Sequence, residues 1–332
     1  MDLAIKTTGA TLLYNSGAFA LADHLGPRNG GMILNLHRVL PAGKAELAYD
    51  AHTVMSAESF RALLEFLGRR YKVVDMETLL HDREESKSQK IALTFDDGWI
   101  DTFEVVRPLL LRFGMAATVF VCTDLAGTVA MLPEERLTRI YDLCRKGGVY
   151  DVFVNTLQTW AGRHDCIPLE NWSAFAKGMT LSTKLSFAAH MEERLGICCG
   201  RKASFMNWNQ IRSMASAGFE IGSHTACHAT LGAEDREVVR LEMTRSLRRI
   251  KFETGEKPKY FAYPNGSLNA VTEQIAMEVG YQQTFSTVPR AISNRYRGGA
   301  RPRIPMDDTL MLDANGRFSA ARAAFHLLRW RR

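Results

Sequence analysis

Ile91-Ala92-Leu93-Thr94-Phe95 is followed directly by Asp96-Asp97-Gly98, so an apolar run ends in two adjacent carboxylates and a glycine. Such a run is typical of a strand buried on both faces, as in a parallel sheet. Asp96 and Asp97 would then lie at the carboxyl edge of the sheet, where α/β proteins keep their chemistry. Neighbouring carboxylates repel each other unless positive charge stands beside them. We therefore predict that one of them binds a divalent metal ion and the other handles a proton.

The composition is that of a globular protein. The chain has 332 residues, of which 46% are hydrophobic, which is enough for one large α/β barrel or two ordinary domains. A net charge of +6 would suit an anionic glycan, a nucleic acid or an anionic membrane surface. A protein that is simply a little basic is the favoured interpretation, and we expect no nucleic-acid partner. Oligomeric state stays open.

The cysteines and the N-terminal residues indicate in which cellular compartment the protein works. The six cysteines contain no CxxC pair, which predicts free thiols in a reducing compartment. No run of 18 apolar residues exists, so we expect no transmembrane helix. Residues 1–31 resemble a signal peptide only weakly. We therefore expect a cytoplasmic protein, with the inner membrane surface as one site of action.

Strand and helix patterns alternate along most of the chain. The alternation indicates a parallel sheet with helical crossovers. We expect a single domain over residues 1–332, with an N-terminal extension at 1–31. Strands are predicted at residues 32–36, 71–75, 91–95, 117–122, 219–222, 260–263, 283–287 and 301–306.

Two segments depart from the alternation. Residues 123–205 look helical in pieces, clearest at 132–143 and 181–195, and carry no motif. This insertion is either a lid on the substrate side or a packing element. Residues 316–332 form a basic C-terminal helix in our interpretation. It either packs on the barrel, which we favour, or lies on a membrane surface.

His224 and His228 are four residues apart, just beyond the strand expected at 219–222. On a helical turn this spacing puts both imidazoles on one side. Two neutral histidines and one carboxylate make a site for zinc or a similar divalent ion, with open positions for water and substrate. The spacing alone is a weak signal. Its position at a strand end, like that of Asp96 and Asp97, strengthens it.

Taken together, the motifs resemble those of the polysaccharide deacetylases, the carbohydrate esterase group that includes NodB-like chitooligosaccharide deacetylases. Residues 94–98 (TFDDG) look like the first motif of the family, and residues 223–228 (SHTACH) look like the second. Residues 261–266 (FAYPNG) are similar to the third, although the arginine usually found there is absent. The resemblance covers about residues 32–122 and 206–306.

The late Leu-x-His motif of the family, which supplies a general acid, is missing. His326 lies in that region, but inside an apolar helical pattern, and we reject it. Residues 35–39 (NLHRV) resemble the early Tyr-His-Arg motif of circularly permuted members that act on poly-N-acetylglucosamine. In those members this histidine, here His37, takes the place of the acid. Residues 303–305 (RIP) are likewise similar to a late strand of those members.

The resemblance implies a distorted (β/α) barrel and a metal ion held by Asp97, His224 and His228. We expect Zn²⁺, with Co²⁺, Mn²⁺, Ni²⁺ and Fe²⁺ as alternatives. Metal-activated water would attack an acetamide carbonyl, with Asp96 as the base and His37 as the acid.

Other residues are expected on the substrate and oxyanion side, namely Tyr263, Asn265 and Arg303. Either Arg303 or Arg301 would orient Asp96. The implied activity is N-deacetylation of an N-acetylated sugar in a polysaccharide or its lipid-linked precursor.

Two alternatives belong to other functional classes. A glycan-binding homologue could keep the fold and lose turnover, since the third-motif arginine and the late histidine are absent. A non-haem iron oxygenase also uses two histidines and a carboxylate. Such an oxygenase leaves Asp96 without a role, which makes this alternative the weaker one.

Overall fold

The computed structural model describes residues 11–19, 30–41, 50–81, 89–161, 172–197, 199, 205–293, 296 and 298–330. A nine-stranded sheet forms the centre, in the order β10-β1-β5-β6-β7-β8-β9, with β4 beside β5 and β11 beside β1. All pairs are parallel except β1 with β10. The strands are β1 Gly30–Leu36, β4 Lys72–Val73, β5 Lys90–Phe95, β6 Thr118–Val121, β7 Glu220–Ser223, β8 Tyr260–Ala262, β9 Gln283–Phe285, β10 Ile292–Ser293 and β11 Ile304–Pro305; β2 Arg38–Leu40 and β3 Val54–Ser56 pair separately.

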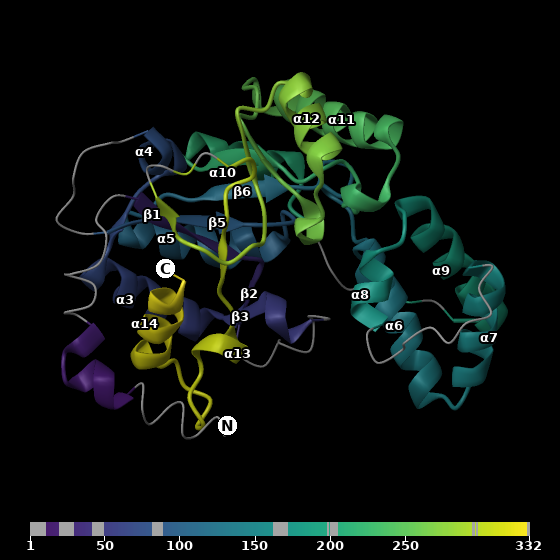
Figure 1. The fold of residues 1–332 in the computed structure, drawn as a ribbon, viewed down its shortest axis with the longest axis horizontal. Coiled ribbons are helices and arrows are strands. Elements are labelled where there is room, and N and C mark those ends of the chain that lie inside the picture. Colours follow the sequence, from purple (N-terminus) through teal and green to yellow (C-terminus); the bar gives the residue numbers. More distant parts are fainter. Residues whose placement is uncertain are drawn as a thin grey trace.

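Helices surround the sheet (Figure 1). Their bounds are α3 Ala57–Arg70, α4 Met76–His81, α5 Arg107–Phe113, α6 Pro133–Lys146, α7 Tyr150–Ala161, α8 Trp172–Lys177, α9 Leu181–Leu195, α10 Trp208–Ser216, α11 Arg236–Thr254, α12 Ala270–Val279, α13 Asp308–Met311 and α14 Ala320–Arg329.

The sheet is curled, and alternate residues of its strands enter two different cores. One cluster gathers residues from five strands, namely Ile33, Ala92, Phe120, Tyr260, Ala262 and Phe285. The residues between them, such as Leu34, Leu93 and Val119, pack against the outer helices in another cluster. Both faces are therefore covered, as the apolar run of β5 predicted. The fold is a distorted (β/α) barrel, and this prediction is confirmed.

Capping residues explain several of the helix boundaries. The Ser56 side chain accepts a hydrogen bond from the Ser59 amide and begins α3. The α3 face that begins at Phe60 and ends at Leu67 is fully buried, and each such side chain contributes about 1.5–3 kcal/mol through burial. Gly114 ends α5 in the left-handed conformation, as is common at helix ends.

The chain after Asp101 does not enter an α-helix directly. Thr102–Val106 is π-helical, and the α-helix starts only at Arg107. Pro108 has no backbone N–H, so the carbonyl of Glu104 cannot receive the bond that an α-helix requires. The wider turn accommodates this missing donor.

The insertion forms a separate helical group. Helices α6 to α9 lie to one side of the sheet (Figure 1). They enclose a core of their own, built around Leu137, Ile140, Phe153 and Phe187. The expected helices at 132–143 and 181–195 appear as α6 and α9.

Helix α14 packs its buried face into the outer core, against α3 and α13. Among the described residues, no helix is both long and apolar enough to cross a bilayer. Four thiols are free, those of Cys122, Cys144, Cys199 and Cys227. The other two cysteines, at 166 and 198, lie outside the described residues, as do most of residues 1–31.

His326, rejected as a general acid, is a buried structural residue. Its Nε2 lies 2.9 Å from the carbonyl oxygen of Pro305. Burial and the charge of Arg329 lower the pKa of the imidazole to about 4. The unfolded chain, with a pKa near 6.5, therefore binds more protons between pH 6.5 and pH 4. Stability from His326 is present above about pH 6.5 and is lost as pH falls toward 4.

Replacing His326 with Gln should remove this pH dependence, because the amide can still donate to Pro305 but does not titrate. Between pH 6.5 and 4 the wild type should lose on the order of 3 kcal/mol more unfolding free energy than the variant. Urea denaturation across this pH range measures the difference. Parallel pH profiles for the two proteins would contradict the assignment.

Candidate active site

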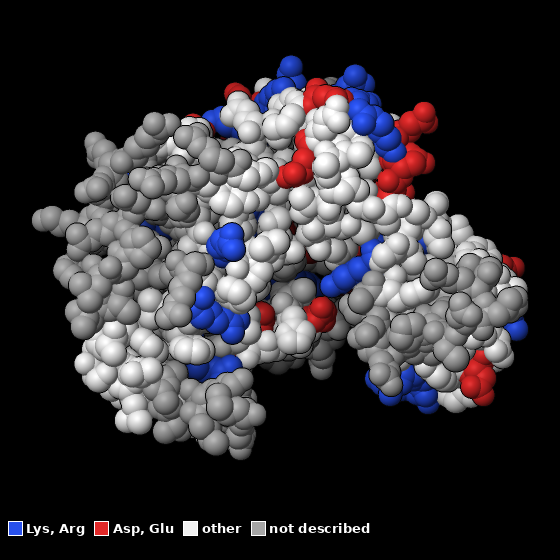
Figure 2. Space-filling model, viewed as in Figure 1, with Lys and Arg blue, Asp and Glu red and all other residues white. Residues whose placement is uncertain are grey.

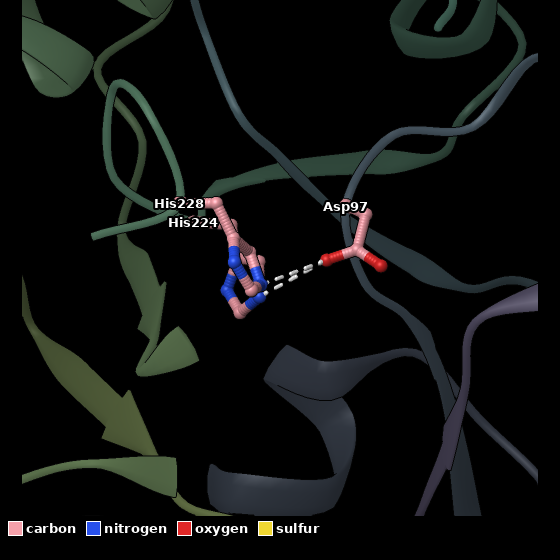
Figure 3. Close-up of side chains that lie close together, drawn as sticks. All are labelled: Asp97, His224 and His228. Carbon is pink, nitrogen blue, oxygen red and sulfur yellow. Dashed lines mark ion pairs between the residues drawn. The ribbon is translucent and has the colours of Figure 1, made fainter. Parts of the chain in front are cut away.

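Two loops bring three donor side chains together at the carboxyl edge of the sheet. Asp97 follows β5, and His224 and His228 follow β7. The Asp97 Oδ1 lies 3.4 Å from the Nε2 atom of each histidine. The three donor atoms lie within 4.8 Å of one another. Figure 3 shows both imidazoles turned toward the same carboxylate oxygen.

The loops adopt uncommon backbone conformations. The positive φ values of non-glycine residues in the described part of the chain all occur here, at Asp97 (72°), Thr225 (68°), His228 (60°) and Asn265 (56°). Such conformations cost of order 1–3 kcal/mol each and persist only where surrounding contacts enforce them. Glu242 of α11 supplies one such contact, because its carboxylate accepts the amides of Ala226 and Cys227 at 3.0 and 2.9 Å.

Both imidazoles are oriented by their other ring nitrogen. His224 Nδ1 lies 2.8 Å from the Ala262 carbonyl oxygen, so this nitrogen carries the hydrogen. His228 Nδ1 lies 3.1 Å from a carboxylate oxygen of Glu134. In each ring Nε2 is thereby the nitrogen that faces Asp97 and can bind a metal ion once it carries no hydrogen.

The Asp97 carboxylate is buried, and its two oxygens have different surroundings. Its Oδ2 accepts the Trp99 indole N–H at 2.8 Å, whereas Oδ1 has no hydrogen-bond partner. An orphaned carboxylate oxygen that faces two imidazole nitrogens fits a divalent cation. Burial raises the pKa of Asp97, but His224 and His228 outweigh burial and hold it well below its usual range. These residues therefore fit the metal ion that the resemblance implies.

The surroundings of His228 also favour positive charge. Burial lowers the pKa of its imidazole, but the Glu134 and Asp97 carboxylates outweigh burial and raise it to about 10. A divalent ion at this position competes with that proton.

Asp96 has a different partner. Arg303, which is fully buried, donates to both Asp96 oxygens, at 2.6 and 2.7 Å. Burial raises the pKa of Asp96, but the charge of Arg303 more than compensates and keeps it below its usual range. His37 Nε2 lies 3.9 Å from Asp96 Oδ2, and the His37 side chain is 24% exposed. Asp96 is thus an oriented, ionised carboxylate beside an accessible histidine.

A cavity of about 570 Å³ opens over these groups. Figure 2 shows the surface hollowed between the barrel and the insertion. Six of the predicted site residues line the cavity, namely His37, Asp96, Asp97, His224, His228 and Asn265.

Two predicted site residues are not among the residues that line the cavity. Tyr263 is buried in the core beside Phe261, with ring centroids 5.0 Å apart, so its position gives no support to the expected substrate contact. Arg303 lies beneath Asp96 and contacts it rather than the substrate space. Of the two arginines considered for orienting Asp96, Arg303 does so, whereas Arg301 donates to Gln283.

The insertion contributes residues that the sequence analysis missed. Glu134, Glu135 and Thr138 of α6 and Lys177 of α8 line the same cavity. Burial raises the pKa of Glu135 to about 7, and the nearby charge of Asp97 acts in the same direction. The sequence around them shows only a proline followed by two acids, a common helix start that points to no site.

Residues 83–284 match the family model of the polysaccharide deacetylases. The chain belongs to the polysaccharide deacetylase family. It is therefore a hydrolase that acts on the amide bonds of acetylated sugars, and the sequence-based recognition is confirmed. No curated protein matches the chain.

Solved structures share the fold. The Streptococcus pyogenes deacetylase PplD, in complex with acetate, is 18% identical with a TM-score of 0.57, covering 86% of this chain and 95% of that chain. IcaB from Ammonifex degensii is 18% identical with a TM-score of 0.54, covering 90% and 97%. The BpsB deacetylase domain from Bordetella bronchiseptica is 18% identical with a TM-score of 0.53, covering 84% and 96%.

The two adjacent aspartates should separate metal binding from proton transfer. Asp97→Asn should weaken zinc binding by more than the roughly 100-fold that loss of an outer partner costs, because a charged ligand is removed. Asp96→Asn should weaken zinc binding much less than Asp97→Asn, because Asp96 is paired with Arg303 and is not a ligand. Competition with a chromophoric chelator measures both constants, and circular dichroism checks folding. Equal zinc affinities for the two variants would contradict the ligand assignment.

Proposed function

We propose that this deacetylase removes the acetyl group from an N-acetylated sugar of a polysaccharide or its lipid-linked precursor, with a divalent ion held by Asp97, His224 and His228. One observation carries the proposal. A three-donor site, an arginine-held carboxylate and an accessible histidine line a single cavity. We propose Zn²⁺, because two nitrogens and one carboxylate oxygen are typical zinc ligands and leave a position open.

Asp96 acts as the general base. When bound, the ion makes water more acidic and polarises the acetamide carbonyl. Arg303 holds both Asp96 oxygens, which fixes the direction in which the carboxylate can accept the proton from the attacking water. The arginine absent from the third motif is thus replaced by one from the start of the β11 segment. Because Arg303 takes the place of the missing arginine, we favour a catalytically active enzyme over a homologue that only binds glycans.

His37 acts as the general acid. An amine is a poor leaving group unless it is protonated, and His37 lies across Asp96 at the cavity wall, where it can supply that proton. Asn265 lines the same cavity, but its side-chain amide donates to Glu134 at 3.3 Å. We therefore propose that a backbone N–H near Asn265, in the turn Pro264–Gly266, stabilises the oxyanion.

Acetate release from N-acetylglucosamine oligomers tests the activity. We expect acetate release that stops when a chelator removes the metal ion and returns when zinc is added.

His37→Ala should lower kcat by about 10²- to 10⁴-fold, the usual contribution of a general acid, and zinc affinity should not change. His81→Ala, at an exposed histidine paired with Glu77, is the control. A His37→Ala enzyme that keeps most of its activity would exclude His37 as the acid. Zinc-independent acetate release would exclude the metal mechanism.

A lipid-linked substrate would require the enzyme to reach a membrane, and we propose contact at the inner membrane surface through the two end segments. Phe19 and Phe325 bring the segment 11–19 and α14 together, with ring centroids 6.4 Å apart. Leu12 and Phe325 are 67% and 46% exposed on them. Arg70 and Arg329 lie near, over the rings of Tyr14 and Trp330. Exposed apolar side chains beside arginines suit an anionic lipid surface.

Sedimentation with anionic phosphatidylglycerol vesicles tests this contact. The double variant Leu12→Ser/Phe325→Ser should lose most binding, and wild-type binding should fall at high salt. Phe252→Ser, at an 80% exposed phenylalanine of α11, is the matched control and should bind like the wild type. Equal sedimentation of all three proteins would contradict the proposed surface.

A further inference from the structure

Helix α6 of the insertion contacts a histidine of the site through Glu134. Glu134, in the first turn of α6, places Oε2 3.1 Å from the Nδ1 of His228. The other helices of the insertion pack mainly around their own core. The Glu134–His228 contact therefore joins this separate helical group to the site.

The Glu134 carboxylate is held on its other side by three donors. Lys184 of α9, whose side chain is fully buried, contacts Oε1. Thr230 and Asn265 donate to the same oxygen at 3.2 and 3.3 Å. These donors come from α9, from the loop after the histidines and from the turn after β8. The carboxylate therefore has one orientation, in which Oε2 faces His228.

This arrangement has a consequence for His228. A carboxylate that accepts the Nδ1 hydrogen fixes the tautomer, sets the ring rotation and makes Nε2 a stronger electron-pair donor. His224 receives only a neutral carbonyl oxygen, that of Ala262. His228 also has a left-handed backbone, with φ of 60°, so its own loop conformation is strained. His228 therefore depends on an outer partner more than His224 does.

We propose that Glu134 is a positioning residue that prepares His228 as a metal ligand, so that the insertion forms part of the metal site. The proposal rests on the proposed function for its catalytic meaning. It assigns residues 123–205 a role beyond covering the substrate. The site is complete only when α6 is docked against the barrel.

The competing explanation is that Glu134 only ties α6 to α9 through its ion pair with Lys184. The structure offers a matched control for this explanation. Arg136 of α6 donates to both carboxylate oxygens of Glu192 of α9, at 3.0 and 2.7 Å. This second ion pair joins the same two helices without contacting a histidine of the site.

Glu134→Gln is the informative substitution. Three donors already face the Oε1 side, so the Gln oxygen would take that position and its NH₂ group would face His228. The Nδ1 atom would then accept, and the hydrogen would move to Nε2, where it blocks the metal position. The loss of charge also leaves Lys184 buried without a counter-ion, which destabilises the protein. The double variant Glu134→Gln/Lys184→Met removes this second effect.

The experiment measures the zinc dissociation constant by chelator competition and the Tm of the zinc-free protein. Four proteins are compared: wild type, Glu134→Gln, Glu134→Gln/Lys184→Met and Glu192→Gln. We expect zinc binding to weaken about 10- to 100-fold in both Glu134 variants, with Tm recovering in the double variant. Glu192→Gln should lower Tm and keep zinc affinity within about threefold of the wild type.

Two results would overturn the proposal. One is wild-type zinc affinity in Glu134→Gln. The other is zinc affinity that recovers together with Tm in the double variant, which would make Glu134 structural only. A wild type that binds zinc but releases no acetate would instead reject the proposed function, and the zinc data would still decide the role of Glu134.

Discussion

A carboxylate oxygen and two imidazole nitrogens that face one another across 3.4 Å require positive charge between them, from a proton or a metal ion, and this constraint governs the site. Asp97, His224 and His228 are aimed at a common point by hydrogen bonds on their far sides, from Trp99 and to Ala262 and Glu134. Their loops hold left-handed backbone at Asp97 and His228, which costs free energy. The fold is therefore less stable than it could be, because it holds an arrangement that suits a bound divalent ion.

Two aspartates that are neighbours in the chain receive opposite surroundings. Asp96 meets the buried guanidinium of Arg303, and Asp97 meets the two imidazoles. The left-handed conformation of Asp97, followed by Gly98 with φ of 81°, turns the chain between them. A side chain at Gly98 would meet Val121 at 3.1 Å, so the tight turn favours glycine. Because the two adjacent carboxyl groups have different environments, one can bind the metal ion and the other can accept a proton.

The sequence was sufficient for features set by local pattern. Apolar runs indicated the strands, and strand-end motifs located the donors that share the cavity. The direction in which each side chain of a motif points was not predictable in the same way. Tyr263 lies two residues after Phe261 and packs beside it in the core, while Asn265 of the same motif reaches the cavity. Glu134 was missed because its helix belongs to an insertion without a motif, and only tertiary packing brings it to His228.

X-ray absorption spectroscopy of the zinc-loaded protein tests the central claim most directly. We expect two imidazole nitrogens and a carboxylate oxygen at about 2.0–2.2 Å from the ion, with the remaining scattering from light atoms. The same spectrum should lose one imidazole contribution in His228→Ala. A sulfur neighbour at about 2.3 Å, or a spectrum without imidazole scattering, would show that zinc binds elsewhere and would contradict the account.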